Sequence, residues 1–155
     1  MIIEERVERS QYVKLITWIV SFIILMAGIV FPVLILWVNQ DMMSKVIGAS
    51  VLCLIFFTLI FTVAYQPRKL ILSETHIIME RILGQVYISY SDITDISLYH
   101  RENVAEIRIF GIGGLGGYIG KFYNSKIGFY TAYVGDYSQA FLIKINNREK
   151  YVMSC

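Results

Sequence analysis

Two long stretches without charged side chains constrain the fold of this chain more than any other feature. Residues 15–38 and residues 46–65 contain no Asp, Glu, Lys or Arg, and only seven residues separate them. A helix rises about 1.5 Å per residue, so the stretches span about 36 and 30 Å, against roughly 30 Å of hydrocarbon in a bilayer. The sequence therefore predicts a transmembrane α-helical hairpin, in which a short loop returns the chain through the same membrane.

The charges that flank these stretches predict the orientation of the hairpin. The cations near the helix ends are Arg6, Arg9 and Lys14 before the first stretch, Lys45 in the loop, and Arg68 and Lys69 after the second. Cationic flanks stay on the cytoplasmic side, so both termini are expected in the cytoplasm. The first stretch is also longer than the apolar core of a cleaved signal peptide, which has about 7–15 residues. We therefore expect an uncleaved, multi-pass anchor in which residues 1–14 form a polar tail, with an interfacial helix turn before the membrane.

The interior of the hairpin carries no group typical of an ion path. Neither stretch contains Asp, Glu, Lys, Arg or His, whereas transport and proton relay usually require ionisable groups within the membrane. A small oligomeric channel or transporter component is therefore a disfavoured alternative. Pro32 removes one backbone hydrogen bond, so a kink is expected between Gly28 and Pro32.

Residues 67–155 leave room for one small domain and no more. This segment contains ten Lys and Arg against eight Asp and Glu, a bias too weak to indicate a nucleic-acid partner. Cys53 and Cys155 lie in different segments, and His76 and His100 have no further ligands at metal spacing, so neither a disulfide nor a metal site is expected. No cofactor is expected either.

Short alternating segments rich in Ile, Val, Tyr and Phe predict that this domain is all-β. The expected strands cover residues 69–73, 76–82, 85–89, 96–100, 105–110, 128–134, 140–145 and 150–154. A short helical turn is expected at Ser91 and Asp92, and Gly84 suits a tight hairpin turn because glycine adopts positive φ at low cost. Residues expected in the core are Ile77, Val86, Ile88, Ile93, Ile96, Leu98, Ile107 and Ile109.

A glycine-rich segment, residues 111–120, satisfies the pattern G-x-G-x-x-G. Its glycines are Gly111, Gly113, Gly114, Gly116, Gly117 and Gly120. A dinucleotide site needs a helix that begins at these glycines, so that its amides face the pyrophosphate. The residues that follow show no helical periodicity, so we expect an extended loop or strand pair that binds no nucleotide. A membrane-anchored enzyme or nucleotide binder using this loop is kept as an alternative.

The same region carries a family resemblance. Residues 110–122 read FGIGGLGGYIGKF, residues 128–133 read GFYTAY, and residues 88–96 read ISYSDITDI. These segments resemble the bacterial pleckstrin-homology-like (PH-like) domain family, many members of which follow a transmembrane hairpin. The resemblance implies a small, strongly bent all-β barrel or sandwich without enzymatic activity. Such barrels usually end in a capping helix, which this sequence does not supply before Cys155, so either the chain is cut short or something else is expected to cover that opening.

Together these observations predict a non-enzymatic protein of the bacterial inner membrane that presents a PH-like domain at the cytoplasmic face. The partners expected are the lipid bilayer and a protein or lipid headgroup, with a homo-oligomer also possible. Residues expected to contact membrane or partner are Arg68, Lys69, Tyr118, Lys121 and Lys126. A cation that faces the bilayer adds about 1 kcal/mol of attraction to anionic lipid. A solvated surface is the alternative interpretation of the same cations.

Overall fold

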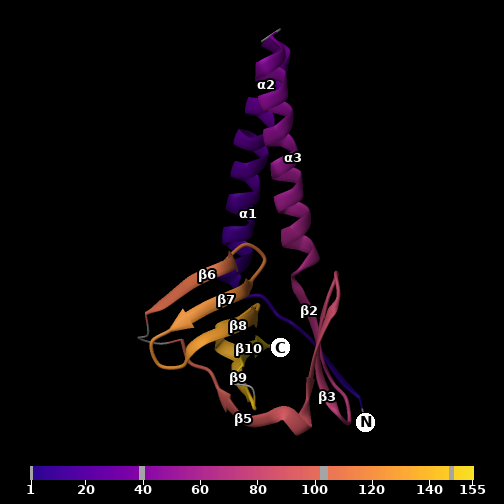
Figure 1. Ribbon diagram of the computed structural model, residues 1–155, viewed down its shortest axis with the longest axis vertical. Helices are drawn as coiled ribbons and strands as arrows, with labels where there is room; N and C mark the ends of the chain where they lie inside the picture. The colour runs from indigo at the N-terminus through magenta and orange to yellow at the C-terminus, as the bar shows by residue number, and fades with distance from the viewer. Residues whose placement is uncertain (1, 39–40, 102–104, 147–148) are drawn as a thin grey trace.

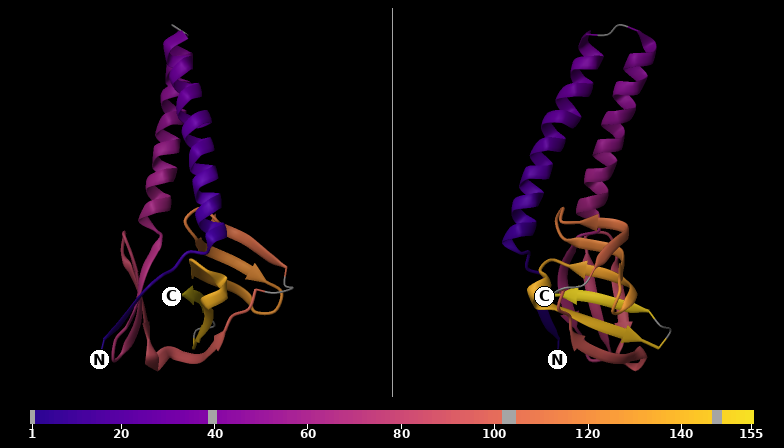
Figure 2. Two further views of the ribbon diagram at one scale, coloured as in Figure 1. Left: turned by 180° about the vertical axis from the view of Figure 1, so that it is seen from behind. Right: turned by 90° about the vertical axis from the view of Figure 1, so that its left-hand side faces the viewer.

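Two helical arms stand on one side of a β domain (Figures 1 and 2). The computed structural model describes residues 2–38, 41–101, 105–146 and 149–155. The first arm contains α1 (Gln11–Leu25), the π-helical segment η1 (Met26–Val30) and α2 (Phe31–Val38), and the second arm is α3 (Met42–Ala64). Both arms are long and apolar enough to cross a membrane, and only 6% and 11% of their most apolar windows are buried. This exposure is consistent with a transmembrane hairpin and unlike the core helices of a soluble domain.

Local sequence explains how the two arms begin and bend. The Ser10 hydroxyl accepts a hydrogen bond from the Val13 amide at 3.2 Å, which satisfies an unpaired amide at the start of α1. Asp41 caps α3 in the same way through the Ser44 amide at 2.9 Å. The irregularity expected before Pro32 is present as η1, whose wider turn accommodates a residue without an amide hydrogen.

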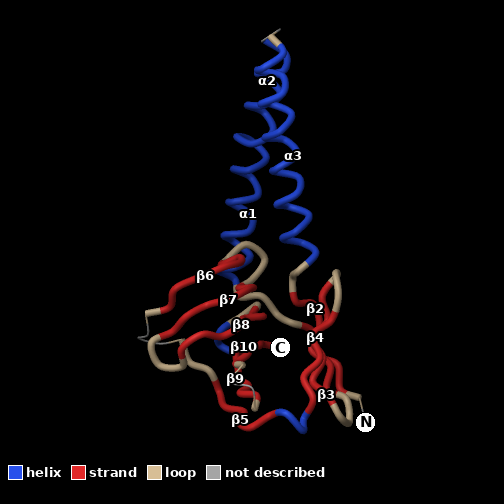
Figure 3. Tube along the Cα trace, viewed as in Figure 1, coloured by secondary structure: helices blue, strands red, loops and turns tan. Residues whose placement is uncertain are grey.

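The β domain consists of two sheets (Figure 3). The first contains β1 (Ile3–Arg6), β2 (Pro67–Leu72), β3 (His76–Arg81) and β4 (Gln85–Ser89), in that order. The second has the order β5-β9-β10-β8-β7-β6, and its strands are β5 (Ile93–Leu98), β6 (Glu106–Gly113), β7 (Tyr118–Asn124), β8 (Gly128–Val134), β9 (Ala140–Ile145) and β10 (Lys150–Ser154). Among the described strands, β10 and β8 are the parallel pair and all other pairs are antiparallel. The sheets form a sandwich rather than a closed barrel.

Two 3-10 turns, η2 (Tyr90–Asp92) and η3 (Tyr137–Gln139), complete the described elements. The first coincides with the helical turn expected at Ser91 and Asp92. Two strands were not predicted. The N-terminal segment, expected to be a polar tail, instead adds β1 to the edge of the first sheet, and β7 follows the glycines where no strand was assigned.

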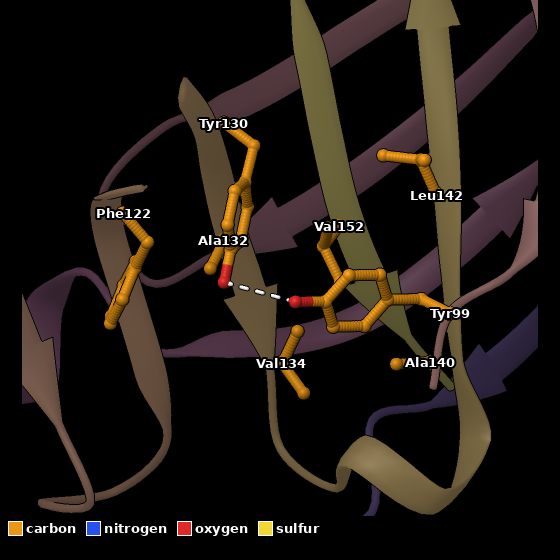
Figure 4. Packing of buried hydrophobic residues seen from close by; sticks show 8 residues of the cluster. All are labelled: Tyr99, Phe122, Tyr130, Ala132, Val134, Ala140, Leu142 and Val152. Carbon is orange, nitrogen blue, oxygen red and sulfur yellow. Dashed lines mark hydrogen bonds between the residues drawn. The ribbon is translucent and has the colours of Figure 1, made fainter. Parts of the chain in front are cut away.

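The core has two layers, one on each face of the second sheet. Between the sheets lie Leu70, Ile77, Met79, Ile88, Ile143 and Met153. On the opposite face, Tyr99 crosses the strands and covers small and aliphatic residues, with its hydroxyl 3.4 Å from that of Tyr130 (Figure 4). The second sheet therefore buries side chains on both of its faces.

The predicted core is half right. Ile77 and Ile88 are buried, and Val86 and Ile93 pack against the layer between the sheets. The prediction is wrong for four residues on β5 and β6, whose exposed fractions lie between 51% and 77%; they are Ile96, Leu98, Ile107 and Ile109. These two strands are the outer edges of the six-stranded sheet, so each has a neighbouring strand on one side only.

Candidate functional site

The lower part of each apolar helical arm is bonded to a tight β-turn of the domain. The Gly116 amide, in the turn between β6 and β7, donates a 2.8 Å hydrogen bond to the Thr17 hydroxyl on α1. The Leu83 amide, in the turn between β3 and β4, donates a 2.8 Å hydrogen bond to the carbonyl of Ala64, the last residue of α3. Both turns are thus held at the level where the apolar helices end.

The glycine-rich segment owes its composition to this close packing. The segment supplies the end of β6, the start of β7 and the turn between them, which agrees with the expected extended loop or strand pair, and no helix begins at its glycines. Gly116 has a φ of +74°, and a Cβ there would overlap the side-chain amide of Gln66, which itself accepts a 2.7 Å hydrogen bond from Arg9. Gly111 and Gly120 are paired across the ladder, where a Cβ on either would overlap the opposing backbone.

The remaining glycines have different surroundings. Gly114 and Gly117 lie in the turn with φ values of +99° and +144°, and the Gly114 amide donates to the Gly117 carbonyl at 2.9 Å. Gly113 is exposed and has no positive φ. The turn therefore depends on glycine at specific positions rather than throughout.

One face of β6, β7 and β8 is only partly covered: Ile119 is buried and Tyr133 packs against the layer between the sheets, whereas other side chains on this face are exposed. Paired residues on neighbouring strands share a face, so the strand registers arrange this face in three rows: Ile107, Tyr123 and Phe129; Phe110, Lys121 and Thr131; and Ile112, Ile119 and Tyr133. The register shift between Arg108 and Phe110 is a bulge at Ile109. Phe110 and Phe129 are 69% and 68% exposed. The face is therefore apolar, with the ammonium group of Lys121 in its central row.

A groove follows this face from the base of α3 toward β10. Its part nearest the helices, which we call the juxtamembrane groove, is lined by Phe61, Tyr65, Arg81, Phe110, Gly111, Ile112, Ile119, Gly120, Lys121, Thr131 and Tyr133. The part farther away, the distal groove, is lined by Ile109, Lys121, Phe129, Tyr130, Thr131, Glu149, Lys150 and Tyr151. The two parts share Lys121 and Thr131, so they are continuous.

Arg81, at the end of β3, closes one side of the juxtamembrane groove. Its guanidinium carbon lies 5.3 Å from the ring centre of Tyr65 and 5.4 Å from that of Tyr133. Its buried Nε has no hydrogen-bond partner among the described residues. Burial raises the pKa of Tyr133, although the nearby Arg81 charge opposes that rise. The guanidinium is thus held between two aromatic rings with one donor unsatisfied.

Comparison with known proteins identifies the β domain. A family model described as a bacterial PH domain matches residues 68–155, which run from β2 to the end of β10. This chain belongs to the bacterial PH domain family. The resemblance stated above is therefore confirmed, as is the combination of an apolar helical hairpin with a PH-like β domain. Neither the curated proteins nor the solved structures gave a match to this chain.

The PH domain brings one of the five predicted contact residues into the groove, Lys121. Arg68 is exposed on β2, and Lys69 forms a 3.1 Å ion pair with Glu4 on β1. Lys126 is exposed in the turn between β7 and β8.

Tyr118 is engaged elsewhere in the PH domain, in a buried polar cluster around Glu106. Its ring lies 4.7 Å from that of Tyr137 and 4.7 Å below the Arg101 guanidinium. The Glu106 side chain is 4% exposed and accepts hydrogen bonds from Tyr99 and Tyr137, each at 3.2 Å, while Arg101 lies 3.1 Å away. Burial, followed by the Glu106 charge, raises the pKa of Tyr137. Glu106 thus holds Tyr99, Arg101 and Tyr137 together on this face of the sheet.

Sequence reasoning missed Phe61, Tyr65 and Arg81. The two aromatics are four residues apart, which places them on one helix face, but this spacing does not indicate what the face meets. No group of three or more His, Cys, Asp or Glu among the described residues could hold a metal ion.

Proposed function

We propose that this protein is a non-enzymatic binding module of the bacterial inner membrane. In this proposal the hairpin spans the membrane, both termini are cytoplasmic, and the PH domain binds a partner directly beneath the bilayer. The observation that carries the proposal is the pair of bonds from Gly116 to Thr17 and from Leu83 to Ala64, because they hold the partly covered apolar face beside the helix bases.

The exposed apolar surface of the helices supports membrane insertion. Trp18 and Trp37 are 78% and 86% exposed near opposite ends of the first arm, where indole rings favour the headgroup level. Thr58 and Thr62 donate hydrogen bonds to carbonyls of the same helix, so these two hydroxyls need no water in the membrane interior. In the turn beside Ala64, Ile82 and Leu83 are 50% and 57% exposed, which suits the boundary between headgroups and hydrocarbon.

The cations near the helix ends support the cytoplasmic orientation. Arg6 and Arg9 precede α1 and Arg68 and Lys69 follow α3, whereas Lys45 lies at the opposite end of the hairpin. Since β1 pairs with β2, the N-terminal segment and the PH domain lie on the same side. The positive-inside rule then favours the cytoplasm for both.

The edge strand β6 supports a polypeptide as the partner bound by the distal part of this face. No described strand pairs with its outer edge, and its Ile107, Ile109 and Phe110 side chains are more than half exposed. Such an edge offers unpaired amides and carbonyls to an extended segment, while the apolar side chains supply contact area. We therefore propose that an extended apolar segment of a different polypeptide adds a strand to β6.

Photo-crosslinking in intact cells tests this function. A benzophenone amino acid replaces Phe110 or Phe129 in the full chain, and Tyr87 on β4, which is 61% exposed on the other sheet, is the matched control. We expect one adduct of defined mass from the first two positions, weakened by Ile107→Glu and missing from the third. An adduct of twice the protein's own mass, or equal labelling from all three positions, would contradict a different polypeptide at β6.

A further inference from the structure

We infer that the juxtamembrane groove binds the phosphate headgroup of an anionic glycerophospholipid, with an acyl chain of that lipid lying along α3. This inference rests on the membrane anchorage proposed above and names a ligand for the part of the face nearest the bilayer. The groove adjoins the β6 edge and shares Phe110 with it, but Arg81 and α3 contribute only to the juxtamembrane groove.

The first observation is that the juxtamembrane groove is lined by two cationic side chains and by no carboxylate. Arg81 and Lys121 line the groove from the first and second sheets, and none of the described lining residues is Asp or Glu. The other lining side chains are aromatic, aliphatic or Thr131. A phosphate between the two cations would therefore meet no carboxylate in the lining of this groove, since Glu149 lines only the distal groove.

The second observation is the unsatisfied donor on Arg81. Stacking between Tyr65 and Tyr133 accounts for the position of the guanidinium, yet it leaves the buried Nε without an acceptor. A buried donor left unpaired is destabilising, because it has lost its hydrogen bonds to water without replacement. A phosphate oxygen is an acceptor suited to this group, because a guanidinium matches phosphate in both geometry and charge.

The third observation is an aromatic track from the apolar part of α3 to the groove. Phe57, Phe61 and Tyr65 are spaced four residues apart, and neighbouring ring centres lie 6.4 and 4.4 Å from each other. Tyr65 lies eight positions after Phe57, or about 12 Å along the helix axis. Phe57 is 71% exposed, whereas Tyr65 lies beneath Arg81. The three rings therefore run from the level of the hydrocarbon to the level of the headgroups. A single lipid molecule spans the same two levels.

The size and position of the groove fit a headgroup. The groove encloses about 220 Å³, which is below the ~300 Å³ typical of sites for larger small molecules. Leu83, at the adjoining turn, is bonded to the last residue of α3. The groove therefore opens at the level of the phosphates in the adjacent leaflet.

Lipid retention by the full chain tests the inference. The protein is reconstituted in nanodiscs that contain phosphatidylcholine with a minor fraction of phosphatidylglycerol, and the phosphatidylglycerol retained after extraction into mild detergent is counted by native mass spectrometry. We expect at least one retained phosphatidylglycerol, and a reduction of about fivefold for Arg81→Gln and for Lys121→Gln, which corresponds to about 1 kcal/mol for each cation. Lys126→Gln, an exposed cation outside the groove, should retain as much lipid as wild type.

The controls separate the possible failures. Lys121 is exposed, so Lys121→Gln tests the site even if Arg81→Gln destabilises the fold. Inorganic phosphate at millimolar concentration should not displace the lipid, since it lacks the acyl chain that lies along Phe57. Displacement of the lipid by phosphate would overturn the inference. So would wild-type lipid retention by both Arg81→Gln and Lys121→Gln, measured on protein that is still inserted in the nanodisc. Release of the protein from native membranes by alkaline carbonate would instead contradict the anchorage itself.

Discussion

The hydroxyl oxygen of Thr17 lies 2.8 Å from the amide nitrogen of Gly116 and accepts its hydrogen, although 99 residues separate the two in the chain. The same hydroxyl donates to the carbonyl of Val13 at 2.6 Å within α1. One side chain thus satisfies a β-turn amide while remaining paired with its own helix. The two parts of the molecule are therefore joined by a contact whose removal has a definite expected effect.

We expect Thr17→Val to weaken the joint between α1 and the PH domain. Valine has nearly the same shape but no acceptor, so the buried Gly116 amide would lose its partner at a cost of about 1–3 kcal/mol. Thermal unfolding of the detergent-solubilised protein, followed by tyrosine fluorescence, measures the loss. Thr17→Ser keeps the acceptor and should remain close to wild type; equal loss in both variants would contradict the role of the hydrogen bond.

The glycine positions in the turn should differ sharply in their tolerance of alanine. Gly116→Ala adds a Cβ at a φ of +74° that overlaps Gln66, so we expect a loss of about 2 kcal/mol or more. At Gly113 the φ is not positive, and the new Cβ would meet the flexible end of the Arg108 side chain at 3.3 Å. Gly113→Ala should therefore change the unfolding free energy by less than about 1 kcal/mol, and a larger effect there than at Gly116 would refute this account.

Alkaline pH should reduce stability in part through Tyr151. Burial, followed by the Glu149 carboxylate 2.9 Å from its hydroxyl, raises the pKa of Tyr151 to about 12 from an ordinary value of 10. A raised folded-state pKa gives stability that is complete below pH 10 and is lost as the pH rises toward 12. After allowance for solvent screening, the expected loss is about 1 kcal/mol.

Tyr151→Phe is the matched variant for this titration, because it removes the ionisable hydroxyl and keeps the ring. Denaturant unfolding at a series of pH values should show wild type losing more stability than Tyr151→Phe between pH 10 and 12. Parallel curves for the two proteins would show that Tyr151 does not carry the effect.

Cysteine labelling should report the orientation of the hairpin. In a Cys53→Ser, Cys155→Ser background, Ser138→Cys places an exposed thiol on the PH domain, and Asp41→Cys places one at the opposite end of the hairpin. A membrane-impermeant maleimide added to intact spheroplasts should label residue 41 and not residue 138, and permeabilisation should expose both. Labelling of residue 138 before permeabilisation would place the domain outside and contradict a cytoplasmic partner.

The sequence patterns predicted the positions of the strands better than they predicted which side chains are buried. Seven of the eight expected strands begin within two residues of an observed strand, because alternation and turn residues are local signals. Alternation identifies two faces of a strand but does not indicate which face is covered. Ile77 and Ile88 lie in the first sheet and are buried, whereas Ile107 lies on an outer strand and is exposed. Strand order across the sheet, which depends on contacts distant in sequence, makes that difference.

The same limit explains how much of the candidate site could be predicted. Lys121 stood out because it lies beside the glycine signature. Arg81 did not, since its significance arises only where β3 meets the end of α3 and the face of β8. Strand β1 was missed because its sequence, IEER, is mostly charged and is stabilised by pairing with β2, a partner more than sixty residues away.

The position of β10 has a consequence for the order of biosynthesis. This strand lies between β8 and β9, parallel to the first and antiparallel to the second, and its Val152 and Met153 are fully buried. Until β10 emerges from the ribosome, β8 and β9 have no shared neighbour and the six-stranded sheet is two separate pieces. The apolar hairpin, by contrast, is complete much earlier and is available for insertion while the domain is still being made. If the hairpin inserts as proposed, the partly covered face of β6, β7 and β8 would first form in a chain that is already tethered beside the bilayer.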